Sequence, residues 1–152
     1  MIELLPLSIG IGLAVSLIFS ESFGIAAGGM VVPGYFALYL THPLEALLTL
    51  AVGFATFGIV HALSAIIIVY GRRRTVLMIL VAYVIGMGIR AVMPDMAGDG
   101  SEVVRVIGFI IPGLVAIWLD RQGVVETVSA LATASMVVRL VLILLVGTEL
   151  LR

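Results

Sequence analysis

Hydrophobic residues in this chain gather into long runs, which short polar or glycine-rich segments separate. About 20 consecutive apolar residues are enough for a helix to span the hydrocarbon core of a bilayer, so runs of this length predict transmembrane helices. Four runs qualify: Leu4–Ser20, Leu44–Tyr70, Val76–Met93 and Val124–Gly147. We therefore expect an all-α integral membrane protein with about four transmembrane helices.

Two shorter apolar segments, Gly24–Leu40 and Val106–Leu119, lie between the predicted spans, and each contains a Pro-Gly pair. The pairs are Pro33-Gly34 and Pro112-Gly113. Proline removes a backbone donor and clashes with the preceding helical turn, while glycine adds conformational freedom. Because lipid cannot satisfy the freed backbone groups, such breaks occur only where protein or water covers them. We predict two broken helices here, each either re-entrant or half the length of a span.

The two Pro-Gly segments are also similar to each other in sequence. Gly29–Leu40 aligns with Gly108–Leu119 through a shared pattern of Gly, three apolar residues, Pro-Gly, two apolar residues, Ala, an aliphatic, an aromatic and Leu. This pattern predicts one membrane domain over residues 1–152 with two internal repeats, about 4–70 and about 75–147. Two spans per repeat would make the repeats parallel, and three would make them inverted. Transporter folds place sites between such paired broken helices.

We therefore predict that the duplicated segments converge and that their free backbone N–H groups line a path for a polymer or another anion. The residues assigned to this path from the two copies are Gly29, Pro33, Gly34, Tyr35, Gly108, Pro112 and Gly113.

The composition agrees with a membrane protein and excludes several kinds of chemistry. Hydrophobic residues make up 62% of the chain and charged residues 11%, against about 45–50% and about 25% in soluble domains. Every basic residue is arginine, so neither a Walker A loop nor a Schiff-base lysine exists. The chain has no cysteine and only two histidines, which leaves no ligand set for a cysteine- or histidine-based metal centre. We expect no cofactor in this chain, and a partner must supply any energy that the function uses.

Charged residues near or inside the spans are candidates for function because a charge in lipid is costly. Arg139 lies deep in the last predicted span and Glu21 follows the first; both are assigned to the anion path, and Arg139 either lines a cavity or pairs with an acidic residue such as Glu21. Arg105 and Arg121 flank the second Pro-Gly segment and either line the anion path or extend to the interface. His61 is interpreted as a neutral histidine within the core. The sequence contains no catalytic constellation.

Three adjacent arginines, Arg72-Arg73-Arg74, lie between the second and third predicted spans. By the positive-inside rule this turn faces the cytoplasm. Four spans would then place both termini in the cytoplasm, and six would place both outside. The turn either docks a partner and guides an anionic chain, or it anchors the topology and binds anionic lipid.

A seam of small residues recurs every four positions along the first span. Its members are Ser8, Gly12, Ser16, Ser20, Gly24 and Gly28. Such seams allow helix backbones to approach closely. The seam serves either packing within the chain or a contact between subunits, and we expect a homo-oligomer.

Several motifs in order resemble one known family. They are Ser16-Leu-Ile-Phe-Ser-Glu21, Gly29-Met-Val-Val-Pro-Gly-Tyr35, Tyr70-Gly-Arg-Arg-Arg74 and Ile111-Pro-Gly-Leu114 followed by Arg121-Gln-Gly123. This arrangement resembles the PgsC or CapC family, the small membrane subunit of poly-γ-glutamate synthase, over nearly the whole chain.

The resemblance implies a location in the bacterial cytoplasmic membrane, several crossings and a role in capsule biosynthesis. It also implies an ATP- and Mg²⁺-dependent amide ligase partner of the PgsB/CapB type, a further export subunit of the PgsA/CapA type, and a polyanionic poly-γ-glutamate product. No nucleic acid is implied. Within such a complex this chain would be a subunit that binds no ATP, which leaves its own part in catalysis open.

We therefore expect the chain to anchor the ligase and to receive or export the polymer, with Arg72, Arg73 and Arg74 either docking the ligase or guiding the polymer chain. The alternatives are a small oligomeric anion transporter or channel without a ligase, and a purely structural assembly subunit.

Overall fold

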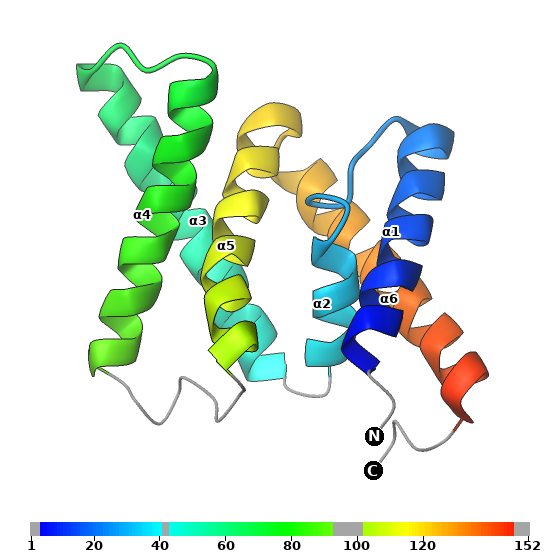
Figure 1. Cartoon of the computed structure of the whole chain (residues 1–152). Helices are drawn as coiled ribbons and strands as arrows, with labels where there is room; N and C mark the ends of the chain where they lie inside the picture. The colour runs from blue at the N-terminus through cyan, green and yellow to red at the C-terminus, as the bar shows by residue number, and fades with distance from the viewer. Residues whose placement is uncertain (1–3, 41–42, 93–101, 148–152) are drawn as a thin grey trace. The chain divides into compact units, whose positions relative to one another are not determined.

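A computed structural model describes residues 4–40, 43–92 and 102–147 (Figure 1). All regular elements in these ranges are helices, as the apolar runs predict. They are α1 (Leu4–Phe23), α2 (Val32–Tyr39), α3 (Pro43–Ile66), α4 (Arg72–Val92), α5 (Glu102–Gln122) and α6 (Val124–Val146). The chain divides into two compact units, one of Met1–Pro43 with Gln122–Arg152 and one of Leu44–Arg121.

Within the described residues, three helices are long and apolar enough to cross a membrane: Leu5–Phe23, Glu45–Ile66 and Val124–Val146. They coincide with three of the four predicted spans and fit a membrane protein. The remaining predicted span forms α4, and a total of four crossings stays a prediction. By contrast, α2 has 8 residues and a length of about 12 Å at 1.5 Å per residue, too short to cross a core of about 30 Å.

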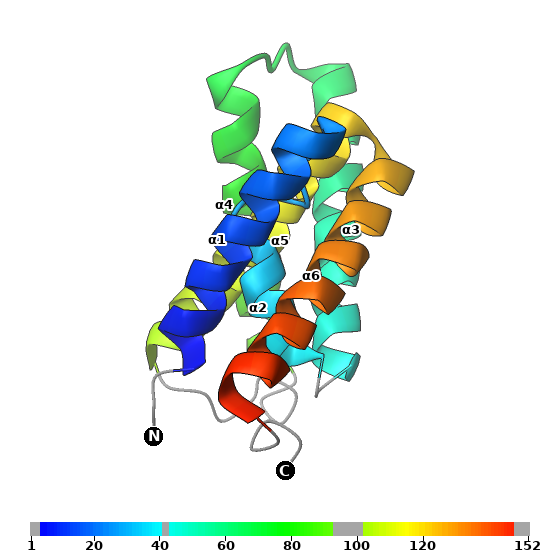
Figure 2. The ribbon, with the colours of Figure 1, turned by 90° about the vertical axis from the view of Figure 1, so that its right-hand side faces the viewer.

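The first unit contains α1, α2 and α6, and each of these helices packs against the other two (Figure 2). Helix α1 ends where Gly24, Gly28 and Gly29 adopt positive φ angles of 65°, 74° and 117°. Side chains rarely allow this backbone conformation, and a right-handed helix cannot contain it. The chain therefore leaves the helix after Phe23 and resumes it only at Val32.

The small-residue seam of α1 serves packing within the first unit. A Cβ atom on Gly12 would lie 2.7 Å from the Cα atom of Gly34, so the α1 and α2 backbones touch. The buried hydroxyls of Ser8 and Ser16 donate to the carbonyls of Gly34 (2.6 Å) and Gly29 (3.3 Å). The seam ends with α1, because Gly24 and Gly28 belong to the irregular segment that follows.

The second unit contains α3, α4 and α5. Its core holds Val60 of α3, Met78 of α4 and Ala116 with Ile117 of α5. A Cβ atom on Gly53 of α3 would lie 3.3 Å from the carbonyl oxygen of Pro112. The pair of helices α3 and α4 is joined by a short turn (Figure 1).

The prediction of a second broken helix is wrong. Pro112 lies inside α5, which runs without interruption from Glu102 to Gln122. The reason is the sequence before each proline: positive-φ glycines precede Pro33, whereas mainly β-branched and apolar residues precede Pro112 and remain helical. Pro33 lies in the first turn of α2, where its missing N–H costs no helical hydrogen bond.

The compact units differ from the predicted repeats. The first unit combines α1 and α2 of the first predicted repeat with α6 of the second. The second unit combines α4 and α5 with α3 of the first repeat. Each unit therefore takes two helices from one predicted repeat and its third helix from the other.

The glycine contact between α1 and α2 provides a stability prediction. We expect Gly12→Ala to destabilise the protein by about 1–3 kcal/mol, because the new methyl group meets backbone rather than a movable side chain. Gly10→Ala on the same helix is the matched control, since nothing lies within 4 Å of a Cβ atom there. Thermal unfolding in detergent measures both. Equal melting temperatures for the two variants would contradict the close contact.

Candidate functional site

The turn between α3 and α4 carries three arginines in adjacent positions. Gly71 has a φ angle of 64°, and this left-handed conformation allows the chain to reverse just before α4. Its carbonyl accepts the first helical hydrogen bonds, from the N–H groups of Arg74 (3.1 Å) and Thr75 (3.4 Å). Arg72 and Arg73 are exposed and Arg74 is partly buried. The sequence thus presents two guanidinium groups outward and turns the third inward.

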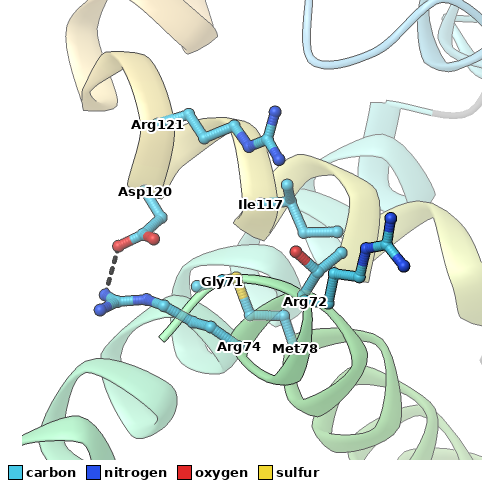
Figure 3. A pocket seen from close by; sticks show the side chains of 8 residues that line it. Gly71, Arg72, Arg74, Met78, Ile117, Asp120 and Arg121 are labelled. Carbon is cyan, nitrogen blue, oxygen red and sulfur yellow. Dashed lines mark hydrogen bonds and ion pairs between the residues drawn. The ribbon is translucent and has the colours of Figure 1, made fainter. Parts of the chain in front are cut away.

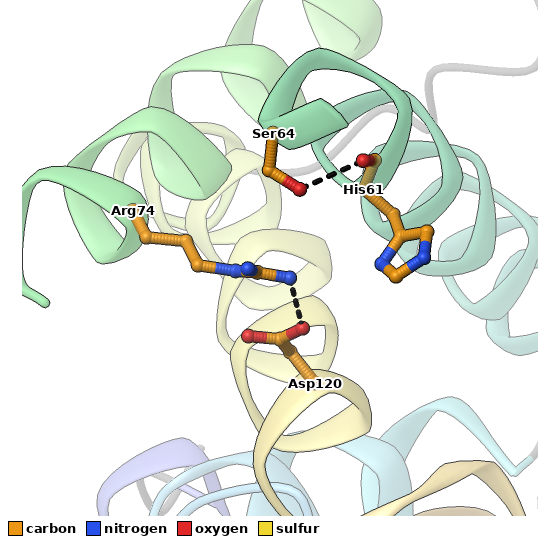
Figure 4. Close-up of polar contacts among 4 residues, drawn as sticks. All are labelled: His61, Ser64, Arg74 and Asp120. Atoms are coloured by element: carbon orange, nitrogen blue, oxygen red, sulfur yellow. Dashed lines mark hydrogen bonds and ion pairs between the residues drawn. The ribbon is translucent and has the colours of Figure 1, made fainter. Parts of the chain in front are cut away.

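Arg74 forms an ion pair with Asp120 near the end of α5 (Figure 4). Both side chains are 22% exposed, so the pair is partly shielded from solvent and from screening by salt. The Nε atom of Arg74 is buried and has no hydrogen-bond partner. Arg74 therefore joins the start of α4 to the end of α5 through one terminal nitrogen.

A pocket of about 350 Å³ opens beside this ion pair (Figure 3). Its lining residues come from the α3–α4 turn, the start of α4 and the end of α5: Gly71, Arg72, Arg74, Thr75, Met78, Ile117, Asp120 and Arg121. Figure 3 shows Arg74 and Asp120 together on one side, with Arg72 and Arg121 on the other. Among these lining residues, three guanidinium groups accompany one carboxylate. The pocket is suited to an anion.

Arg121, predicted to flank the anion path, lies in the last turn of α5 and lines this pocket. Its guanidinium carbon lies 5.7 Å from the centre of the Trp118 ring, within the range of a cation–π contact. A positive charge at the C-terminus of α5 also interacts favourably with the helix dipole. The aromatic ring and the dipole hold Arg121 without neutralising it.

The first Pro-Gly segment lies against α1, and the anion path assigned to it stays a prediction. Gly29, Pro33, Gly34 and Tyr35 are all buried in the first unit. A Cβ atom on Gly34 would lie 2.7 Å from the carbonyl oxygen of Ser8, so α1 covers the start of α2. Pro33-Gly34 therefore makes a close contact between α1 and α2.

The second Pro-Gly pair, Pro112-Gly113, also makes a close contact between two helices, within the second unit. A Cβ atom on Gly113 would lie 3.0 Å from the Cα atom of Ile79, so α5 approaches the backbone of α4. Pro112 is buried beside it, and Gly108 lies one turn earlier on α5. Arg105 also belongs to α5, but its side chain is outside the described part of the structure.

Arg139 stabilises the short helix α2. Its terminal nitrogen donates to the carbonyl oxygen of Ala37 over 3.0 Å, in the last turn of α2. Carbonyls at the end of a helix have no partner within the helix, and a cation there also opposes the negative end of the dipole. Glu21 is exposed in the last turn of α1. The predicted Glu21–Arg139 ion pair is not formed among the described residues.

Gln122 has a role that the sequence did not reveal, as does Asp120 through its ion pair with Arg74. The amide of Gln122 accepts from the N–H of Ala26 (3.1 Å) and donates to the carbonyl of the same residue. It also donates to the hydroxyl of Thr127 (3.2 Å). Gln122 thereby fixes the irregular segment between α1 and α2. The motif Arg121-Gln-Gly123 marked this position, but only tertiary structure supplies its partner.

The structure also shows where His61 lies and how the acidic and histidine side chains are grouped. His61 is exposed, not a core histidine, and its ring lies 5.7 Å from that of Phe57. Its carbonyl accepts from the Ser64 hydroxyl over 2.7 Å (Figure 4). Within the described ranges, no group of three or more His, Asp or Glu side chains is placed to hold a metal ion.

The Arg139 contact provides a second prediction. We expect Arg139→Leu to destabilise the first unit by about 1.5–3 kcal/mol, the usual range for a hydrogen bond to a charged group. Arg139→Lys, which keeps the charge and a donor, should retain part of this stability. Met136→Leu at an exposed position of α6 is the control. Thermal unfolding of the purified variants measures these differences. An Arg139→Leu variant with the melting temperature of the unaltered chain would show that the contact adds nothing to stability.

The comparisons with known proteins agree with the sequence resemblance. The family model described as "Capsule biosynthesis CapC" matches residues 11–128. The chain is 38% identical over 118 residues to the Bacillus subtilis (strain 168) protein named "PGA biosynthesis protein CapC", covering 77% of this chain and 78% of that protein. It is 35% identical over 125 residues to the Bacillus anthracis "Capsule biosynthesis protein CapC", covering 82% and 83%. No solved structure matches the chain. The family match and the coverage of both relatives show that this chain belongs to the CapC family of capsule biosynthesis proteins.

Proposed function

We propose that this chain is the membrane subunit of a poly-γ-glutamate synthase, in which it anchors an ATP-dependent amide ligase and receives the growing polymer. The observation that carries the proposal is the arginine-rich turn before α4, with its adjacent anion-sized pocket. The names of the two relatives support the link to capsule and PGA biosynthesis.

The chemistry of the product matches the charge of this turn. Poly-γ-glutamate carries one carboxylate per residue, so it is a strong polyanion at neutral pH. A cluster of positive charge accelerates the capture of such a partner, and the effect extends over a Debye length of about 8 Å at physiological ionic strength. The positive end of the α4 dipole adds to the field at the same place.

The ligase must come from a partner. This chain has no lysine or cysteine and no nucleotide-binding motif, so ATP and Mg²⁺ would be bound by the ligase. The arginine turn would face the cytoplasm under the positive-inside rule, which is where a soluble ATP-dependent ligase operates. A further export subunit of the CapA type would act on the other side of the membrane.

Arg73 is the residue best placed to contact the ligase. It is exposed and does not line the pocket, whereas Arg72 and Arg74 do. We therefore assign contact with the protein partner to Arg73 and binding of the polymer to the pocket. The two activities are therefore separable by mutation.

The docking role of Arg73 is tested by charge reversal. We expect Arg73→Glu to lower recovery of the ligase with the tagged membrane subunit by about tenfold or more, because a reversed charge at an interface repels the former partner. Arg73→Lys should keep most of the recovery if charge alone matters. Polymer output is measured in parallel. Normal recovery and output with Arg73→Glu would refute docking through this residue.

Membrane orientation must be controlled in the same experiment, because arginines near a span also set topology. The chain contains no cysteine, so Ile68→Cys, at an exposed position of the turn, provides a single labelling site. Labelling with a membrane-impermeant maleimide reports the side on which the turn lies. If Arg73→Glu changes that side, the turn is a topology anchor, and the docking assignment is wrong.

A further inference from the structure

We infer that the pocket between the start of α4 and the end of α5 binds consecutive α-carboxylates of the γ-linked glutamate chain, and that Asp120 holds one of its arginines until the polymer arrives. This inference rests on the proposed function, since it names the ligand of a site that the proposal assigns to the polymer.

The cationic side of the pocket can accept two carboxylates. Arg72 and Arg121 both line it, and neither is paired with a carboxylate among the described residues. A guanidinium group presents its donors in a planar fork that matches a carboxylate in two-point contact. Their separate positions, one on α4 and one on α5, provide a contact from each helix.

Asp120 demonstrates that the pocket is suited to this chemistry. Its carboxylate already binds Arg74, and both residues line the pocket. The Asp120 side chain therefore makes the same kind of contact that a carboxylate of the polymer would make. Arg74 has a buried Nε atom without a partner, so the resident ion pair leaves part of its hydrogen-bonding capacity unused. An incoming carboxylate would compete with Asp120 for this guanidinium.

The apolar side of the pocket favours a chain with methylene groups. Met78 and Ile117 line it and are 1% and 8% exposed. In γ-linked polyglutamate, two methylene groups of the backbone separate each carboxylate-bearing carbon from the next amide. A surface with guanidinium groups on one side and buried aliphatic residues on the other matches this alternation of carboxylate and hydrocarbon.

Size favours a short stretch of polymer over a lipid. A volume of about 350 Å³ lies near the small end of the range for ligand pockets, roughly 300–1,000 Å³. It suits one or two glutamate residues. An anionic phospholipid offers a single phosphate charge and two long acyl chains, whereas this pocket places three guanidinium groups around one short apolar wall formed by Met78 and Ile117.

The experiment measures binding of a fluorescent γ-linked tetraglutamate to the purified full-length chain in nanodiscs of neutral lipid. We expect the unaltered chain to bind, and the double variant Arg72→Gln/Arg121→Gln to bind about tenfold more weakly or worse, since each lost charged hydrogen bond costs at least that much. Asp120→Asn should bind several-fold more tightly because the internal competitor has lost its charge. Met136→Leu, at an exposed position of α6 outside the pocket, should stay within about twofold of the unaltered chain.

Several results would overturn the inference. Unchanged binding by the double variant would place the polymer elsewhere, and weaker binding by Asp120→Asn would show that Asp120 positions Arg74 rather than competes for it. If vesicles of phosphatidylglycerol displace the probe while added γ-linked tetraglutamate does not, the pocket is a lipid site. A double variant that is aggregated on size exclusion is replaced by Arg72→Lys/Arg121→Lys, which must also bind more weakly if the two-point contact matters.

The binding measurement is independent of the ligase. If the chain binds tetraglutamate as described but never recovers a ligase, the proposed synthase role fails and the pocket assignment stands. If it recovers the ligase through Arg73 but the pocket variants bind normally, the pocket assignment alone fails.

Discussion

The backbone between α1 and the end of α2 carries polar groups that hydrocarbon cannot satisfy, and the first unit is organised around supplying their partners. In lipid, non-helical backbone is stable only where protein or water bonds to it. Four side chains provide such bonds here, from α1, the α5–α6 junction and α6: Ser16 to Gly29, Ser8 to Gly34, Gln122 to Ala26 and Arg139 to Ala37. Three polar residues of the predicted spans, Ser8, Ser16 and Arg139, are thus explained by this one segment.

The two Pro-Gly segments differ in how far their backbone depends on hydrogen-bond partners from elsewhere in the chain. The first follows glycines with positive φ angles and needs external hydrogen-bond partners. The second lies inside a continuous helix, so its segment satisfies most of its own backbone groups. Both copies nonetheless place the glycine after the proline against the preceding helix, Gly34 on α1 and Gly113 on α4. A shared sequence pattern therefore has a shared packing role, although the local backbone differs.

The arginines divide into those engaged in structure and those available to a ligand. Arg139 is bound to the end of α2, and Arg74 to Asp120. Arg73 is exposed, and Arg72 and Arg121 line the pocket. The structure thus adds a candidate anion site at the start of α4 and the end of α5, apart from the Pro-Gly segments named from the sequence.

The sequence by itself determined the helical class, three helices that are long and apolar enough to cross a membrane, and the family, because hydrophobic run length and ordered motifs are properties of consecutive residues. It also identified the arginine turn, since a cluster of like charges needs no partner to be recognised. It did not determine that α5 passes through Pro112, because a proline breaks a helix only when neighbouring residues and packing do not hold it. Nor did it find Asp120 beside Arg74 or Gln122 beside Ala26: these partners are far apart in the chain, and only the packing of the helices decides which distant polar groups meet.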